Sequence, residues 1–339
     1  MKTPTPRRIR LTIAALALSA ALGSAQAAVF KDAQLESLHE AGKFIELEQL
    51  AQTRLKASAA DAEARAALVL GLSLADPADA KRLEAGASQA KLCTEQHPNV
   101  AVCHLAAAQN LGLQLLNMGM GKAMRSVGTL KDLWIRALEL EPTSFMARVQ
   151  LAKLYLTLPG LMGGSNSKAR ELEAAVRVSQ PETARIIRVH ILGEAKKWAE
   201  MEAELLALKP TKDAAMQEEV RDATMQLALN FLKDGKDLAK AKSLYESLQR
   251  DQAGRAAGFY GAARVQAALG QTDEALRLFE RAKTLAGADD YPIDQRLGDT
   301  LLAKGDKAQA KAVYERFVAN KRAKPANVDE VRKSLAKLG

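Results

Sequence analysis

Two cysteines and two histidines lie close together around one expected turn. Cys93 and Cys103 are the only cysteines of the 339-residue chain, and His97 and His104 lie beside them in the sequence. If Pro98 separates two antiparallel helices, the two thiols come within reach of each other. A disulfide across a loop of this size stabilises a fold by about 2.5–3 kcal/mol by a chain-entropy argument. We predict a Cys93–Cys103 disulfide, and two separately buried thiols are the alternative.

The same cluster could in principle bind a metal ion through thiolate and imidazole groups. The chain has four histidines, His39, His97, His104 and His190, and none of them shows the spacing of a recognised metal motif. Turn and packing roles are therefore favoured for these side chains. We predict no metal site and no cofactor.

Three methionines lie in a glycine-containing stretch at about residues 117–128. Met118, Met120 and Met124 could offer thioether ligands to Cu(I). Pliable methionines also suit an apolar surface that contacts a partner, and we favour this interpretation. A metal- or small-ligand-binding protein remains the alternative function.

A second insert, residues 158–167, contains Gly163, Gly164 and Ser165 just before an expected helix. Free backbone N–H groups at a helix start can bind an anion or an acidic side chain. Capping of the helix by Ser165 or Ser167 explains the same residues more simply. Because the two inserts lie between the helices of adjacent pairs, we expect them to share one edge of the fold and to contact a partner there.

No catalytic constellation stands out. The chain shows no nucleophile paired with a base, no phosphate-binding loop and no recognisable pair of carboxylates. A glutamate acting as a general acid needs an apolar pocket to raise its pKa, whereas the glutamates here lie beside Lys or Arg on expected helix faces. We predict that the protein is not an enzyme, with a cell-wall-active hydrolase as the least favoured alternative.

The elements that position these residues follow from a repeated pattern. Three segments share a small residue, then an aromatic residue, then another apolar or small residue, at intervals of 34 and 35 residues. Such a period predicts pairs of antiparallel helices that must stack to bury their apolar faces. The segments are Ala241-x3-Tyr245-x2-Leu248, Ala275-x3-Phe279-x2-Ala282 and Ala310-x3-Tyr314-x2-Phe317.

The middle of the chain carries related patterns, Trp134-x2-Ala137-x4-Pro142 and then Leu151-Ala152-x2-Tyr155. Together these patterns resemble the tetratricopeptide repeat (TPR). The resemblance implies an all-α fold, an α-solenoid in which TPR helix-turn-helix pairs form a right-handed superhelix, closed by a capping helix from Val328 to Leu338. Seven or eight pairs are expected, at roughly 32–59, 62–97, 99–142, 144–181, 182–209, 213–251, 253–288 and 290–322.

A narrower resemblance covers about 85 residues. The stretch from His97 through the first insert to Pro142, with the second insert from Pro159 to Ala169, resembles the TPR-like domain of the regulator-of-microtubule-dynamics family and its bacterial relatives. The resemblance implies a helical-repeat fold and a non-enzymatic role, and it carries over no catalytic residues.

The concave face of such a solenoid is the expected binding groove. On the TPR template, positions 2, 5, 9, 12 and 13 of each first helix point inward. A mixture of aliphatic, aromatic and basic groups there suits a protein or peptide partner of some acidic character. These positions are Lys153, Met225, Leu229, Lys233, Tyr260, Arg264, Gln295 and Asp299.

The N-terminus has the layout of a secretory signal peptide. A basic segment is followed by an apolar run from Leu11 to Leu22 and by the small-x-small pattern of Ala25-Gln26-Ala27. The run is too short for a membrane span, which needs about 20 apolar residues. We expect cleavage after Ala27, a periplasmic location, and no membrane span afterwards. We also expect two parts in the mature chain, irregular repeats at 28–209 and regular repeats with the cap at 210–339.

Charge argues against a nucleic-acid partner. Four of the 49 lysines and arginines, and none of the 40 acids, lie in residues 1–27, so the remainder carries a net charge of only +5. Nucleic-acid binding favours clustered basic residues with interleaved aromatics, and no such cluster occurs. The favoured function is an exported scaffold or adaptor that binds another protein.

Overall fold

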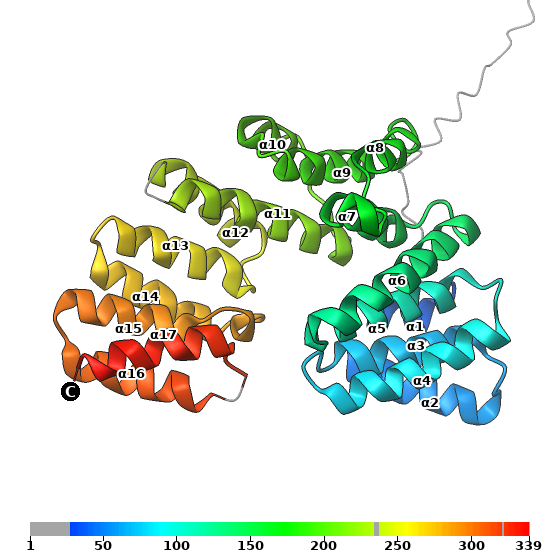
Figure 1. The fold of residues 1–339 in the computed structure, drawn as a ribbon, viewed down its shortest axis with the longest axis horizontal. Helices are drawn as coiled ribbons and strands as arrows, with labels where there is room; N and C mark the ends of the chain where they lie inside the picture. Colours follow the sequence, from blue (N-terminus) through cyan, green and yellow to red (C-terminus); the bar gives the residue numbers. More distant parts are fainter. Residues whose placement is uncertain (1–27, 234–236, 321, 339) are drawn as a thin grey trace, which may run out of the picture.

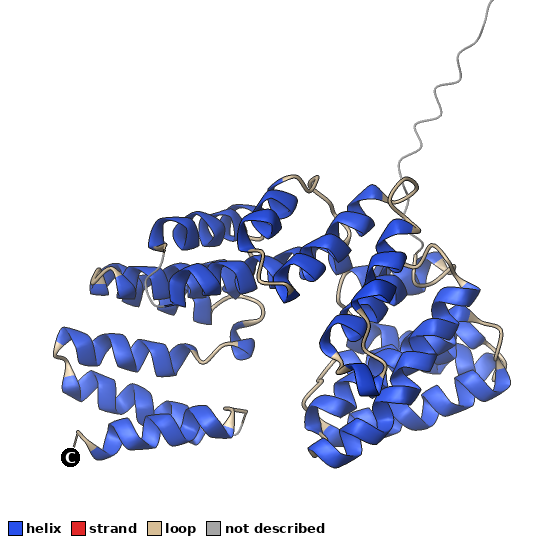
Figure 2. Cartoon of the chain, turned by 45° about the horizontal axis from the view of Figure 1, so that its top comes forward, coloured by secondary structure: helices blue, strands red, loops and turns tan. Residues whose placement is uncertain are grey.

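The structure is a computed structural model that describes residues 28–233, 237–320 and 322–338. The predicted signal peptide, residues 1–27, lies outside the described residues. The described part consists of α-helices with short connections and contains no β-strand (Figure 2). The helices are α1 (Ala33–Glu40), α2 (Phe44–Ala57), α3 (Ala62–Leu74), α4 (Ala80–Gln96), α5 (Ala101–Asn117), α6 (Met120–Leu140), α7 (Phe145–Thr157), α8 (Asn166–Ala174), α9 (Pro181–Glu194), α10 (Trp198–Leu206), α11 (Ala214–Leu232), α12 (Leu238–Asp251), α13 (Ala256–Ala268), α14 (Thr272–Lys283), α15 (Ile293–Lys304), α16 (Lys307–Ala319) and α17 (Pro325–Ala336).

Short polar side chains define where several helices begin. Asp61, Asp79 and Ser144 each accept a hydrogen bond from a backbone N–H in the first turn of α3, α4 and α7. These bonds satisfy N–H groups that have no partner inside the helix. Gly305 ends α15 in the left-handed conformation, with φ of 92°, which glycine adopts without steric cost.

In the described residues the helices form eight antiparallel pairs followed by α17, and the pairs match the predicted ranges to within one residue at Pro181, where α9 begins. Each pair packs against the next, so the all-α solenoid expected from the repeats is confirmed. The array is also continuous through the α9–α10 pair, because α9 contacts α7, α8, α10 and α11. The last helix, α17, packs against α16 and covers the end of the array with Val331 buried.

Close packing of glycine against an aromatic ring characterises the C-terminal repeats. A Cβ added to Gly298 of α15 would lie 2.4 Å from the ring of Tyr314 in α16, and one on Gly261 of α13 would lie 2.1 Å from Tyr245 in α12. No Cβ fits at such distances. The two glycines therefore let the fully buried tyrosines fill the space between helices.

The buried apolar residues form two clusters. The first extends from Phe30 to Met216, and the second extends from Val189 to Val331. The two clusters overlap along the sequence, because α9 contributes Ile186 and Ile187 to the first and Val189 to the second. The change from one core to the other therefore takes place within α9–α11 and not at a single linker.

A disulfide joins Cys93 in α4 to Cys103 in α5, with their Cα atoms 5.3 Å apart. Both cysteines are fully buried in the first core. His104 lies next to the bridge, and its Nε2 makes a hydrogen bond of 2.9 Å with the carbonyl oxygen of Pro98. The turn between α4 and α5 is thus held by a covalent bond and by a side-chain contact to its backbone.

The first predicted insert is not a loop. The structure places the α5–α6 turn at Met118 and Gly119, and α6 already begins at Met120. The extra residues lengthen the helices, giving 17 residues in α5 and 21 in α6. Glycine lowers helix propensity only by about 1 kcal/mol per residue, and the apolar contacts of α6 with α5 and α7 outweigh that loss.

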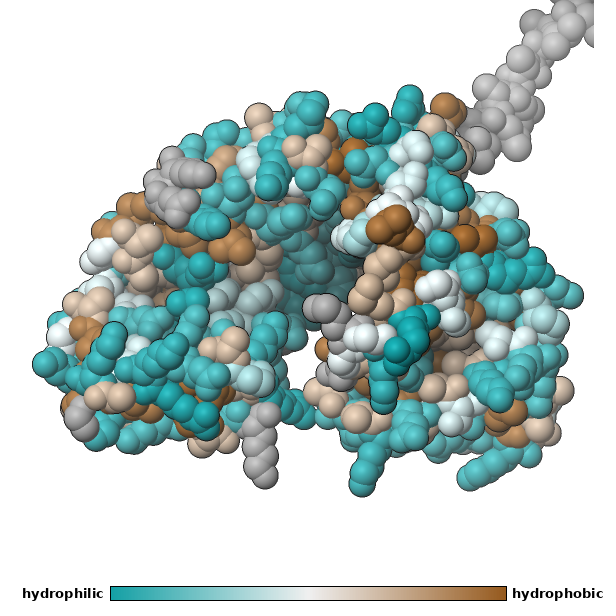
Figure 3. Space-filling view, in the orientation of Figure 1, coloured by the Kyte–Doolittle hydropathy of each residue, from teal (hydrophilic) through white to brown (hydrophobic). Residues whose placement is uncertain are grey.

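The array curves so that its two ends face each other. In Figure 1, α1–α6 and α11–α17 form two arms that are joined by α7–α10. The space-filling view shows a hollow between the arms (Figure 3). The two arms also contact each other, because Arg322 of the α16–α17 connection lies beside Asp76 of the α3–α4 connection, with nitrogen and oxygen 3.1 Å apart.

Candidate functional site

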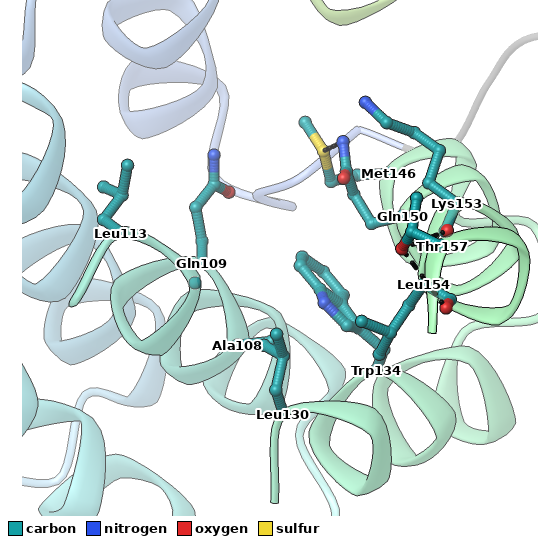
Figure 4. A pocket seen from close by; sticks show the side chains of 11 residues that line it. Ala108, Gln109, Leu113, Leu130, Trp134, Met146, Gln150, Lys153, Leu154 and Thr157 are labelled. Carbon is teal, nitrogen blue, oxygen red and sulfur yellow. Dashed lines mark hydrogen bonds between the residues drawn. The ribbon is translucent and has the colours of Figure 1, made fainter. Parts of the chain in front are cut away.

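A pocket of about 370 Å³ opens between α5, α6 and α7 (Figure 4). Its floor is apolar and includes Leu130, Trp134 and Leu154, and its rim carries Gln109 and Lys153. Trp134 is 5% exposed, so its indole is packed against the core while one side borders the pocket. An apolar floor with a few polar groups at the rim is the usual form of a binding pocket.

Gly112 of α5 also lines this pocket, and a Cβ added to it would meet no atom within 4 Å. This glycine therefore faces open space, in contrast to Gly298, which a tyrosine ring covers. The two glycines occupy the same position in the same pattern, Leu-Gly-x2-Leu, at residues 111–115 and 297–301. The sequence pattern is therefore shared, and only the surroundings of the glycine differ. The pocket exists because no side chain of α6 occupies the space beside Gly112.

Two further pockets adjoin the first around the C-terminal half of α7. A pocket of about 220 Å³ between α7, α9 and α11 shares Lys153 and Thr157 with the first. A third, of about 330 Å³, shares Leu156 and Glu194 with the second and reaches the α7–α8 loop. We call the three adjoining pockets the α7 groove.

A buried polar network supports the floor of the α7 groove. The carboxylate of Glu219 in α11 is 6% exposed and accepts hydrogen bonds from Lys153 Nζ (2.9 Å), Gln150 Nε2 (2.9 Å) and His190 Nε2 (2.8 Å). Burial alone would raise the pKa of Glu219, but the hydrogen bond from His190 and the charge of Lys153 outweigh burial and lower it to about 2. Glu219 therefore stays ionised and links α7, α9 and α11.

The second pocket of the groove is rich in carboxylates. Glu194 and Asp222 line it, while the charge of Lys153 is already balanced by Glu219. Burial raises the pKa of the Asp222 carboxyl, and Arg221, 3.5 Å away, only partly offsets this rise. This pocket thus presents two carboxylates beside a lysine that Glu219 already engages.

The predicted groove residues of the C-terminal repeats are mostly used in packing. Tyr260 is 5% exposed and stacks on Tyr291, with ring centroids 4.7 Å apart. The guanidinium carbon of Arg264 lies over the Tyr260 ring, 5.7 Å from its centroid. Gln295 is 3% exposed and donates to Glu330 of the cap. The expectation that Tyr260 and Gln295 present open groups to a partner is therefore wrong, because neighbouring side chains cover them.

Asp299 is likewise committed, because it accepts a hydrogen bond of 2.7 Å from the hydroxyl of the buried Tyr314. In α11 the predicted register differs from the observed one. The residues of α11 that line the α7 groove are Asp222, Ala223 and Gln226. Met225 packs against the second core, and Leu229 and Lys233 are exposed outside the pockets. Only Lys153 of the eight predicted groove residues lines the α7 groove.

The second insert helps to form the third pocket. Gly164 and Ser165 line it, and Ser165 caps α8 by accepting the backbone N–H of Lys168. The predicted capping of the helix by Ser165 is therefore observed. Gly163 lies against α6, since a Cβ added to it would be 2.8 Å from Nζ of Lys131.

The first methionine stretch lies apart from the residues that line the groove. Met118 is partly buried at the α5–α6 turn, and Met124 is 53% exposed on α6. The backbone of Met120 begins α6. Among the described residues, no group of three or more His, Cys, Asp and Glu side chains is arranged to hold a metal ion.

Residues 295–320, which span α15 and α16, match the family model of the tetratricopeptide repeat. The fold is that of a TPR solenoid. Among solved structures, the chain is similar to yeast Tom70, with 14% identity, a TM-score of 0.58, and coverage of 87% of this chain and 59% of the Tom70 chain. The matched part is therefore less than two thirds of Tom70. No curated protein matches the chain.

Two other solved structures show weaker similarity to this TPR solenoid. One is YrrB, a TPR protein with an unusual peptide-binding site, at 15% identity, a TM-score of 0.30, and coverage of 65% of this chain and 99% of that one. The other is Acl4, an assembly chaperone of RpL4, at 13% identity, a TM-score of 0.36, and coverage of 76% and 92%. In the described part of the TPR solenoid, no helix is both long and apolar enough to cross a membrane.

Sequence reasoning missed most of the residues around the groove. Gln109, Gly112, Thr157 and Gln226 were not predicted, although they line its first two pockets. One signal was available for Gly112, because its Leu-Gly-x2-Leu pattern marks a first helix of a TPR pair. That pattern does not by itself reveal whether an aromatic ring covers the glycine.

Proposed function

We propose that this TPR solenoid is an exported interaction module that binds a protein partner in the α7 groove. The observation that carries the proposal is the open space beside Gly112, at the edge of an apolar pocket that contains Trp134. TPR-like solenoids use their curved surfaces for binding. In the C-terminal repeats the predicted groove residues Tyr260, Gln295 and Asp299 are engaged by neighbouring side chains, whereas the α7 groove is open, and this favours the α7 groove as the site for a partner.

The proposed role is not catalytic. Glu219 is the most buried carboxylate beside the groove, and a carboxyl group with a pKa of about 2 is a poor general acid or base near neutral pH. Its three hydrogen-bond donors come from the chain itself. The network is therefore suited to holding α7, α9 and α11 in place around a bound segment.

We place the protein in the periplasm. The basic and apolar pattern of residues 1–27 supports export, and a buried disulfide agrees with an oxidising compartment. Fractionation of cells that produce the chain with and without residues 2–27 tests this point. Release of the full-length product with the periplasmic fraction is expected, and retention in the cytoplasm in both cases would contradict it.

Filling the pocket tests the binding role. Gly112→Leu projects a side chain into the open space, whereas Gly128→Leu makes the same change on α6, where a Cβ also meets no atom within 4 Å. Both changes replace a helical glycine, so both are expected to preserve folding. Crosslinked complexes are purified from cells and compared by mass spectrometry. A partner retained by Gly128→Leu and lost by Gly112→Leu is expected, and equal recovery by both variants would contradict the proposal.

A further inference from the structure

We infer that the α7 groove selects a protein segment in which an apolar side chain lies close to a basic side chain. This inference rests on the proposed function and specifies the chemistry of the partner. It comes from two adjoining pockets of unlike character, one apolar and one carboxylate-lined, which meet at Lys153 and Thr157. One segment crossing this boundary contacts both pockets.

The first pocket provides the apolar contact. Leu113, Leu130, Trp134, Met146 and Leu154 line it, and no charged group other than Lys153 does. An aliphatic or aromatic side chain that enters this space removes apolar surface from water on both partners, which favours binding. The open space beside Gly112 is where such a side chain would lie.

The second pocket provides the charge complementarity. Its charged or titratable lining residues are Lys153, His190, Glu194 and Asp222. Lys153 and His190 both donate hydrogen bonds to Glu219, which lies behind them. Glu194 and Asp222 therefore remain as the carboxylates that face the pocket, and a lysine or arginine of the partner is the group that would balance them.

The geometry also disfavours the partner of acidic character that the sequence suggested. An acidic side chain beside Asp222 would add a like charge to a carboxyl group whose pKa burial already raises. The basic group nearest to it, Arg221, is already shared between Glu218 at 3.2 Å and Asp222 at 3.5 Å. The arginine that lines the α7 groove, Arg170, belongs to the third pocket and not to the second, so it does not balance the charge of Asp222.

Selection of peptides on the full chain tests this inference. A library of random peptides displayed on phage is panned against the immobilised protein, and enriched peptides are synthesised for fluorescence-anisotropy titration. We expect enriched sequences to contain Lys or Arg near Leu, Ile, Phe or Trp. Replacing both carboxylates, with Glu194→Gln and Asp222→Asn, should weaken binding of these peptides about tenfold, as loss of a charge-assisted contact does. Glu315→Gln on α16 serves as the matched control, because it removes an exposed carboxylate outside the groove.

A charge swap separates a binding effect from a folding effect. Asp222→Lys should reject the basic peptides and bind their Arg→Glu or Lys→Glu counterparts more tightly than the wild type does. Enriched peptides without basic residues would overturn this inference, and so would an affinity that the double substitution leaves unchanged. The binding role would stay intact in either case if Gly112→Leu still weakens binding of the enriched peptides. A selection that enriches no peptide over the bare support would overturn the binding role itself.

Discussion

The α5–α6 and α15–α16 pairs start from the same Leu-Gly-x2-Leu pattern and differ in what covers the glycine. In α15–α16, Gly298 and Tyr314 lie at similar distances from the turn at Gly305, so the antiparallel helices bring the ring onto the glycine. In α5–α6 the aromatic residue is Trp134, which lies much farther from its turn than Gly112 does. The regular pair is therefore filled, and the longer pair leaves a pocket.

The difference extends to the inner face of the two regions. In the C-terminal repeats, Tyr260, Tyr291 and Asp299 are occupied by contacts within the chain. Around α7, three adjoining pockets remain open, and two of them are lined by residues that bind Glu219. Regular repeat spacing thus favours stability, and departures from it create the space that a partner needs.

The largest expected effect comes from placing the same side chain at the two glycines. Gly298→Leu must displace Tyr314, whose ring would lie 2.4 Å from the first added atom. Overpacking of this kind destabilises a core by about 3 kcal/mol. Gly112→Leu should instead stabilise the chain by up to about 1 kcal/mol, because leucine has the higher helix propensity. Urea denaturation followed by circular dichroism measures both, and similar losses for the two variants would show that the pocket is not open.

Breaking the Cys93–Cys103 bond should destabilise only the N-terminal region. Loss of a crosslink over this loop costs about 2.5 kcal/mol by the chain-entropy argument. We expect a reducing agent to speed backbone hydrogen exchange in α4 and α5 and to leave α13–α16 unchanged. The same result should follow from Cys93→Ala combined with Cys103→Ala. Equal acceleration in both regions would mean that the two cores unfold as a single unit.

Acid should weaken the link between the two regions at Glu219. Because its pKa in the folded state is about 2, below the ordinary value of 4.5, its contribution to stability is present above pH 4.5 and is lost as the pH falls towards 2. Glu219→Gln should therefore cost about 2 kcal/mol at pH 6 and much less at pH 2. Denaturation of both proteins across this range measures the difference, with Glu315→Gln as the control. A cost that does not change with pH would contradict the assigned ionisation.

The smallest effect is expected where the two arms meet. The side chains of Arg322 and Asp76 are 60% and 34% exposed, and exposed ion pairs contribute about 0.5 kcal/mol or less. Asp76→Asn should leave the free energy of unfolding almost unchanged. Small-angle X-ray scattering of this variant and the wild type measures any opening of the arms. A loss of stability of about 2 kcal/mol would mean that the arms act as one closed ring.

The repeat pattern predicted the helices well because it reports packing between neighbours. The small and aromatic residues at Ala241, Tyr245, Ala275 and Phe279 are all buried where the pattern placed them. The first insert was mistaken for a loop, since its glycines suggested a break. In α6 the apolar residues that follow, such as Leu130 and Trp134, hold the segment in a helix.

The candidate site was harder to predict because a pocket forms where no side chain fills the space between helices. Lys153, which the TPR template selected, does line the α7 groove, and its role in binding stays a prediction. Tyr260 and Gln295 occupy template positions too, but their neighbours Tyr291 and Glu330 lie more than 30 residues away in the sequence. Whether an inward position stays open is a property of tertiary packing that the repeat period does not contain.

Photo-crosslinking at four positions of the concave face tests the central claim most directly. A photoreactive amino acid is introduced at Gln109 or Thr157, which line the α7 groove, and at Leu229 or Arg264, which were predicted from the repeat template and lie in the C-terminal repeats. The account predicts a discrete crosslinked partner from the first two positions and none from the last two. Crosslinks from Leu229 and Arg264 alone would contradict it, because the partner would then bind the C-terminal repeats and not the α7 groove.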